Sequence, residues 1–225
     1  MSSRFWYLDP PRRRGLAEVA LDTGYEKIIC PAHDGHTRGG KRIGALSVIV
    51  HPLRVGDFTF IWGGDILVSQ RVLDLFEKYR VTGFKAERAK TSYPETIKGR
   101  PPDLFELVVT GWGGFAAPAA GAKLVKSCSA CGHKVYTVAE SSRLIDAAAW
   151  DGSDLFIVWP LPGYRFASDR LANILRQEKV SGVKVVPAPQ LPIERGDTLT
   201  PGPLSWYMSE ERARELVRRS PPWMD

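Results

Sequence analysis

The sequence predicts an α+β fold with mixed or mostly antiparallel sheets, in which two related strand-helix-strand units pack together. Three observations lead to this prediction: an internal repeat, several short segments with the pattern of strands, and two cysteine-containing turns that lie far apart in the chain. With 225 residues, 44% of them hydrophobic, the chain can bury a substantial core. We expect one domain over residues 1–195, followed by a linker and a C-terminal helical tail over residues 196–225.

The internal repeat covers about residues 58–88 and 155–187. Residues 69–76 align with residues 168–175 at an offset of 99 positions, and upstream the alignment holds if two residues are inserted. Each copy has a serine that can cap a helix, then apolar residues at helical spacing, then a glycine where a turn calls for positive φ. A structural duplication explains these shared positions better than a chance similarity of two amphipathic units.

The other elements follow from shorter patterns. Alternating or β-branched residues predict strands over residues 46–50, 58–62, 104–110 and 134–138. The segment 111–121, rich in Gly and Ala, is expected to be a flexible connection or a surface that meets a partner. Residues 196–203 look like a linker. Ser209 can then cap a helix over 210–219, which has acids in its first turn and arginines in its last, as the helix dipole favours.

Two short turns carry metal-ligand residues at an i, i+3 spacing: Cys30-x-x-His33 within residues 30–36 and Cys128-x-x-Cys131 within residues 128–133. Such a turn lets two ligand atoms face one point, and the two turns together supply the four ligands of a closed tetrahedral Zn²⁺ site. The expected zinc ligands are Cys30, His33, Cys128 and Cys131. His36 or His133 could replace His33, because the sequence does not fix which imidazole points inward.

A C-x-x-C turn can also be a redox dithiol, or simply two buried free cysteines. A redox motif normally lies at a helix start in a βαβ context, whereas residues 134–138, after the second turn, have the pattern of a strand. This context favours a zinc ribbon. Because four protein ligands leave no open coordination position, the zinc would be structural and would contribute folding free energy.

The net charge of +6 and the pI of about 9.3 are compatible with a nucleic-acid partner or an acidic protein partner. The basic residues cluster only at residues 12–14 and at Arg38, Lys41 and Arg42, and aromatic residues do not alternate with them. Nucleic-acid binding is therefore not the favoured interpretation. No segment is typical of a signal peptide or a membrane span, so we expect a cytoplasmic protein without membrane contact, where reduced thiols are available for zinc.

Several features occur together in one order along the chain. They are the aromatic start at residues 4–8, the turns at 30–36 and 128–133, Val68-Ser69 at the first helix, and residues 154–156 at the second copy. This combination resembles the myxobacterial double-CXXCG motif family over about residues 4–190. The sequence departs from the family pattern at His33, where the family has cysteine. The resemblance implies a bacterial immunity protein that protects a cell against a kin-discrimination toxin.

The expected function is therefore to bind and neutralise a cognate protein toxin, without catalysis. Aromatic side chains often anchor interfaces, which makes four aromatic residues in loops or the tail candidate contacts: Trp112, Trp206, Tyr207 and Trp223. The alternative function is a nucleic-acid-binding zinc ribbon. An enzyme is not expected, because the histidines at 33, 36 and 51 have no second catalytic partner in the sequence.

Overall fold

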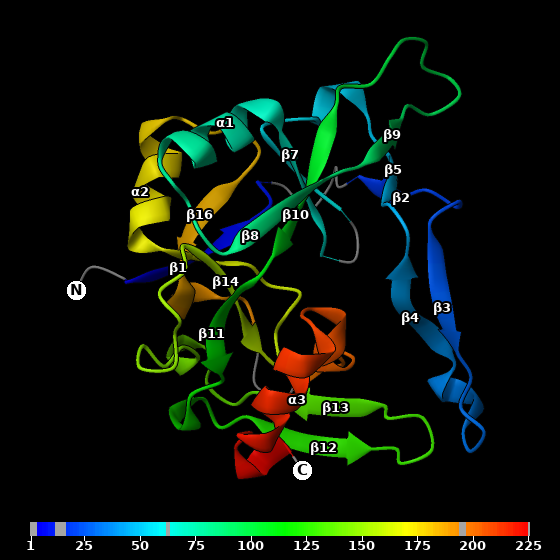
Figure 1. The fold of residues 1–225 in the computed structure, drawn as a ribbon, viewed down its shortest axis with the longest axis vertical. Coiled ribbons are helices and arrows are strands. Elements are labelled where there is room, and N and C mark those ends of the chain that lie inside the picture. Colours follow the sequence, from blue (N-terminus) through cyan, green and yellow to red (C-terminus); the bar gives the residue numbers. More distant parts are fainter. Residues whose placement is uncertain (1–3, 12–16, 62–63, 194–196, 225) are drawn as a thin grey trace.

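The computed structural model describes residues 4–11, 17–61, 64–193 and 197–224 (Figure 1). Within these ranges the α+β fold is confirmed, with three α-helices and with strands that form antiparallel and mixed sheets. Three features of the sequence analysis lie outside the described residues: the basic cluster at 12–14, Trp62, and the expected domain boundary at 195–196.

A five-stranded sheet brings the N-terminal strand next to strands from residues 155–187. Its order is β11 (Gly111–Phe115), β14 (Leu155–Trp159), β15 (Phe166–Ser168), β1 (Phe5–Asp9) and β16 (Lys184–Pro187). The strands pair antiparallel, except that β11 and β14 run parallel. All five residues of β14 are buried, as in a strand covered on both faces.

The other described strands form smaller sheets. A four-stranded antiparallel sheet has the order β6 (Phe58–Phe60), β7 (Ile66–Ser69), β10 (Leu104–Val109) and β8 (Phe84–Arg88). Two three-stranded sheets are β2 (Glu18–Val19), β5 (Ser47–Ile49) and β9 (Lys90–Ser92), and β12 (Lys123–Ser127), β13 (Lys134–Thr137) and β17 (Thr198–Leu199). A separate two-stranded hairpin consists of β3 (Gly24–Ile28) and β4 (Arg38–Ile43). The four segments predicted as strands correspond to β5, β6, β10 and β13.

Two of the helices each follow a strand directly, one in residues 58–88 and one in residues 155–187. Helix α1 (Gln70–Lys78) follows β7, and helix α2 (Asp169–Gln177) follows β15. Each buries one apolar face: Val72 and Phe76 in α1, and Leu171, Ala172, Ile174 and Leu175 in α2. None of the helices in the described ranges combines the length and apolar character that crossing a bilayer requires.

The predicted serine caps form in two of three helices. The Ser168 hydroxyl accepts from the Leu171 amide at 3.2 Å, and the Ser209 hydroxyl accepts from the Arg212 amide at 3.3 Å. Ser69 begins α1 but its side chain makes no cap hydrogen bond. Its hydroxyl donates instead to the Asp57 carboxylate at 3.1 Å, because this stronger acceptor lies beside it.

The segment 111–121 differs from the expectation of a flexible connection or a partner surface. Its first part is β11, whose first four residues are buried in the five-stranded sheet. A Cβ atom at Gly111 would clash with the Leu155 carbonyl, and one at Gly113 would clash with the Phe156 ring. The glycines here allow two strands to approach closely, and glycine content alone does not separate that role from flexibility.

The described part of the C-terminal segment packs against the rest of the chain rather than extending from it as a tail. Strand β17 pairs with β13, within the expected linker. Helix α3 (Glu210–Arg218) follows, and Leu204, Ala213 and Met224 belong to the main hydrophobic core. The Lys134 ammonium donates to the Met224 carbonyl at 2.9 Å.

Candidate metal centre

The tips of two β-hairpins meet at one side of the molecule. The loop between β3 and β4 carries Cys30 and His36, and the turn between β12 and β13 carries Cys128 and Cys131. Figure 1 shows the β3–β4 hairpin extending away from the body, with its tip beside the turn that joins β12 to β13. Two segments about a hundred residues apart in sequence are thus brought together only at these tips.

The four side chains converge on one point. The Cys30 and Cys128 sulfurs are 3.8 Å apart, the Cys131 sulfur is 3.8 Å from the His36 Nδ1, and all four ligand atoms lie within 4.8 Å of one another. A tetrahedral zinc ion with Zn–S bonds of about 2.3 Å requires sulfurs about 3.8 Å apart. The observed spacing matches that requirement, and all three cysteines are free thiols.

The histidine in this cluster is His36 rather than His33. Residues Asp34–His36 form one turn of 3-10 helix, in which the His36 amide donates to the His33 carbonyl at 3.1 Å. The turn leaves His33 exposed and brings the half-buried His36 to the cysteines. The alternative ligand His36 therefore fits the geometry better than His33. His133 lies with its ring centroid 4.6 Å from that of His36, outside the four converging groups.

Backbone hydrogen bonds close the turn over residues 128–133, and its glycine adopts a positive φ. The Cys128 amide donates to the His133 carbonyl at 2.8 Å, and the Gly132 amide donates to the Cys128 carbonyl at 2.8 Å. Gly132 has φ of +66°, a conformation that favours glycine. This closed loop places both of its cysteine sulfurs on the side that faces the β3–β4 hairpin.

Arg38, on β4, lies against the cluster. Its guanidinium donates to the Cys131 sulfur at 3.5 Å and to the carbonyls of Cys131 at 3.2 Å and His36 at 3.0 Å. This contact lowers the pKa of the Cys131 thiol to about 6, so that the sulfur is mostly thiolate, the form that binds metal. The sequence identified Arg38 only as a member of a basic cluster, because its contact with Cys131 depends on how two hairpins far apart in the chain are placed.

Burial shifts the pKa values of two groups in and beside the cluster, Cys30 and His133. It raises the pKa of the Cys30 thiol, which is 3% exposed, so this sulfur favours the neutral form unless a metal ion replaces its proton. Burial, followed by the charges of Arg38 and His36, lowers the pKa of His133. The donor set of three cysteine sulfurs and one imidazole fits a divalent metal ion that favours tetrahedral sulfur and nitrogen ligands.

The four aromatic residues expected to contact a partner pack within the protein. Trp112 is buried in the main core, and Tyr207 and Trp223 pack against that core. The Tyr207 hydroxyl also donates to the Pro201 carbonyl at 2.6 Å. Trp206 lies against Gly202, where a Cβ atom would clash with the indole. Burial of β11 accounts for Trp112, and packing of the C-terminal segment accounts for the other three. Sequence context alone revealed neither.

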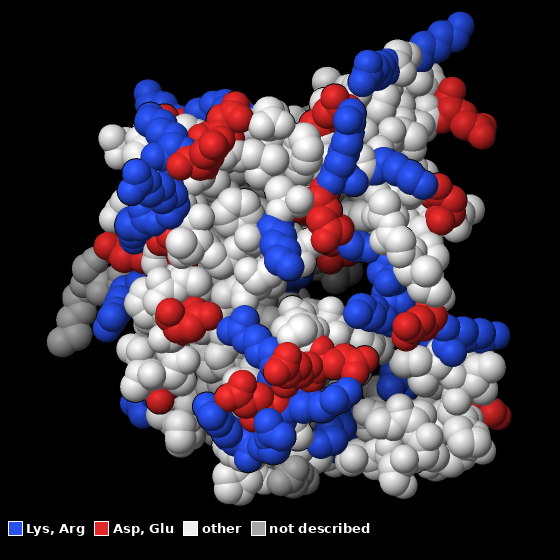
Figure 2. All heavy atoms as spheres, in the orientation of Figure 1, with Lys and Arg blue, Asp and Glu red and all other residues white. Residues whose placement is uncertain are grey.

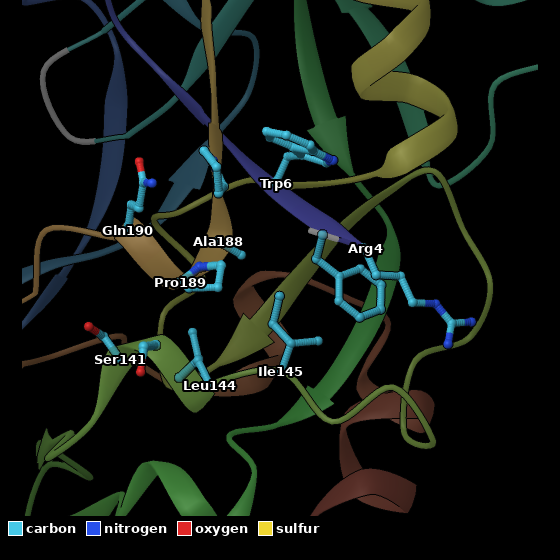
Figure 3. A pocket seen from close by; sticks show the side chains of 11 residues that line it. Arg4, Trp6, Ser141, Leu144, Ile145, Ala188, Pro189 and Gln190 are labelled. Atoms are coloured by element: carbon cyan, nitrogen blue, oxygen red, sulfur yellow. The ribbon is translucent and has the colours of Figure 1, made fainter. Parts of the chain in front are cut away.

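A hollow of about 630 Å³ lies beside the start of β1 (Figure 3). Leu144 and Ile145 point from one side toward Ala188 and Pro189 on the other, with Arg4 at the rim. The Ser141 hydroxyl, which could suggest a nucleophile, donates instead to the carbonyls of residues 191 and 193. The walls are mostly apolar. The Ser142 hydroxyl, also on the wall, donates to the Glu140 carboxylate, which caps the 3-10 turn Ser141–Arg143.

No protein-family model matches the sequence, and no curated protein is significantly similar to it.

Proposed function

We propose that this chain is an immunity-type binding protein that neutralises a cognate protein toxin stoichiometrically, and that one structural Zn²⁺ ion holds its contact surface in place. The observation that carries the proposal is the convergence of four ligands on one point: Cys30, His36, Cys128 and Cys131. A Cys₃His set with no fifth protein donor is typical of structural zinc and leaves no position for a reacting water.

The zinc ion has a clear structural task. No side chain of residues 24–43 belongs to the hydrophobic clusters of the described chain, so the β3–β4 hairpin has little apolar contact with the body. An isolated two-stranded hairpin is only marginally stable in water. At its base, the Arg42 guanidinium binds Glu106 at 2.5 Å and lies 3.5 Å from Asp65. Zinc would fasten the other end, at the tip.

The same hairpin supports the binding role. It exposes Tyr25, Ile29 and Ile43, which are 44%, 65% and 60% solvent-accessible. Exposed apolar side chains gathered on one element are a feature of protein interaction sites. We therefore place the toxin contact on this hairpin in place of the four packed aromatic residues. The family assignment and the cytoplasmic location remain part of this proposal. The first rests on the resemblance described above, and the second on the reduced thiols that a zinc site requires.

The charges favour a protein partner over nucleic acid. Of the three basic residues on β4, Arg38 is held by the cysteine cluster and Arg42 by carboxylates. Lys41 remains as an exposed cation there. Nucleic-acid affinity depends on several cations that can reach phosphates. Beside Lys41, the exposed lysines of the two hairpins are Lys27 on β3 and Lys123 and Lys126 on β12, so nucleic-acid binding stays the alternative function.

We further propose that the two strand-helix-strand units, β7–α1–β8 and β15–α2–β16, are copies related by duplication. Reciprocal contacts between them support this. The Asp57 carboxylate accepts from the Ser181 amide at 2.9 Å, and the Asp154 carboxylate accepts from the Thr82 amide at 3.0 Å. Thr82 and Ser181 are 99 residues apart, the offset of the repeat, and the aspartates differ by 97, as the two-residue insertion requires.

The arginines of the two helices repeat the pattern. Arg71 of α1 donates to the Glu178 carbonyl at 2.6 Å, and Arg170 of α2 donates to the Tyr79 carbonyl at 2.8 Å. Tyr79 and Glu178 are again 99 residues apart. Each copy thus uses an aspartate and an arginine to bind the end of the other copy's helix, which independent origins of the two units would not require.

The function is tested by growth rescue. The protein encoded beside this chain is expressed in a host with and without it, and we expect toxicity that only this chain relieves. The double variant Ile29→Asp/Ile43→Asp should abolish rescue while keeping its zinc. Leu53→Asp, at an even more exposed apolar position elsewhere, should keep rescue. Toxicity that persists with the wild-type chain, or a neighbouring protein that is not toxic, contradicts the immunity role.

A further inference from the structure

A second site lies between the β3–β4 hairpin and the body. It is a cavity of about 340 Å³, and Figure 2 shows this face hollowed between the two parts. One wall is formed by residues 40–42 of β4, another by residues 107–109 of β10, and a third by Trp206 and Tyr207. Cavities of this size enclose small organic ligands.

Most charged groups in the interior of the cavity already have partners. Arg42 bridges two carboxylates, with its two terminal nitrogens toward Asp65 and Glu106. Glu106 is buried, and burial raises the pKa of its carboxyl group despite the opposing effect of Arg42. Lys41 and Glu87 line the cavity as exposed residues of opposite charge.

Arg165 is the exception. Its Nη1 donates to the Pro162 carbonyl, and its Nε, like the Nε of Arg42, is buried without a hydrogen-bond partner in the described part of the chain. What separates it from Arg42 is its charge, which no described carboxylate balances. It also makes no ion pair with any carboxylate among the described residues. Burial lowers its pKa, which expresses the cost of holding a guanidinium out of water. A guanidinium on a cavity wall whose charge no described carboxylate balances leaves that charge for a partner from outside the chain.

The missing partner can be identified by its chemistry. A guanidinium fork binds a planar oxyanion through charge-assisted hydrogen bonds, and a carboxylate is the oxyanion of matching geometry and single charge. A doubly charged group would be repelled by Asp65 and Glu106, which Arg42 alone neutralises in part. Beside Arg165, the cavity offers the rings of Trp206 and Tyr207 and the apolar side chain of Ile157.

We propose that this cavity binds a small aromatic carboxylate, with its oxyanion on the guanidinium of Arg165 and its ring against Trp206 and Tyr207. The assignment depends on the cavity and not on the toxin-binding role. The proposed ligand would be the same if the chain bound a partner other than a toxin. Because β4 forms one wall, the ligand would also lie beneath the hairpin that we assign to the toxin.

The test uses the zinc-loaded full chain and benzoate as the probe, with binding followed by calorimetry and by the NMR signals of arginine Nε–H groups. We expect saturable binding with a millimolar dissociation constant, as is normal for so small a molecule, and a shift of the Arg165 signal. Benzamide has the same shape without the charge and should bind about tenfold more weakly or worse. Zinc content is measured on the same sample, so a failure of the metal centre is seen separately.

Two variants complete the test. Arg165→Gln should weaken benzoate binding by about 10- to 100-fold, the effect of one charge-assisted contact, while Arg143→Gln, at an exposed arginine outside the cavity, should not change it. If Arg165→Gln does not fold, the comparison of benzoate with benzamide on the wild type decides alone. Equal binding of the two probes, or no saturable benzoate binding, overturns the proposal.

Discussion

Replacing Cys128 with serine should release the β3–β4 hairpin while the body of the protein stays folded. The variant removes one of four metal ligands and so leaves the hairpin tip without its attachment. What remains at the base is the contact of Arg42 with Glu106, a charge-assisted pair worth about 1.5–3 kcal/mol. Since the hairpin itself is marginal, it would then be open in roughly 1–10% of molecules.

With zinc bound, opening must also break metal coordination, and structural zinc in small domains contributes about 10 kcal/mol or more. Even a third of that value suppresses opening by a factor of about 100 or more, since 1.4 kcal/mol is tenfold. Limited trypsin digestion measures this directly, because Lys27 and Lys41 lie on the two hairpin strands. We expect cleavage there at least about 100-fold faster in Cys128→Ser than in the wild type, with a far-UV spectrum close to wild type.

His33→Ala is the matched control, because His33 is exposed and outside the four ligands. It should keep wild-type protection, whereas His36→Ala should behave like Cys128→Ser. Equal cleavage of Cys128→Ser and wild type at both lysines would refute the reasoning, because the hairpin would then be held by contacts other than the metal. Global unfolding of Cys128→Ser would show instead that the hairpin is part of the cooperative core.

The remaining predictions concern the contacts between residues 57–82 and residues 154–182. Asp154→Asn should lower the free energy of unfolding, measured by urea denaturation, by about 1–3 kcal/mol, because the Asp154 carboxylate accepts from Arg170, Thr82 and Ser168. The control Asp103→Asn, in an exposed ion pair, should change it by less than about 1 kcal/mol. Burial alone would raise the pKa of Asp154, but these hydrogen bonds outweigh it and lower the pKa below 3.8. The stabilisation from Asp154 should therefore be complete above about pH 5 and be lost as the pH falls through the folded-state pKa, with no such acid-dependent loss in Asp154→Asn. Gly182→Ala should lower the free energy of unfolding by about 3 kcal/mol or more, because the Gly182 φ is +78° and the new Cβ would clash with the Phe58 carbonyl. The control Gly44→Ala should lower it by only about 1 kcal/mol, because Gly44 has a similar φ of +79° but open space around it.

The elements that the sequence predicted best are those whose pattern is local. The apolar stripes of α1 and α2 and the β-branched runs of β5, β6, β10 and β13 depend on neighbours in the chain, so periodicity alone locates them. The glycine-rich β11 is different. Glycine is required there because Leu155 and Phe156 lie too close to leave room for a Cβ atom, and this long-range contact cannot be recognised from neighbouring residues in the sequence.

The candidate site was predictable to the same extent. Two turns with ligands at an i, i+3 spacing identified the three cysteines, since that spacing is a local property. Choosing His36 over His33 required knowing that residues 34–36 form a helical turn, which moves one imidazole inward and the other outward. Arg38 was missed because a strand start beside the cluster is visible only once both hairpins are placed.

The central claim is tested most directly by the zinc content of the purified chain, measured by native mass spectrometry. The account predicts one zinc ion per chain in the wild type and in His33→Ala, and none in Cys131→Ser or His36→Ala. A wild-type chain that carries no zinc after purification in metal-containing buffer, and binds none when zinc is added under reducing conditions, would contradict it.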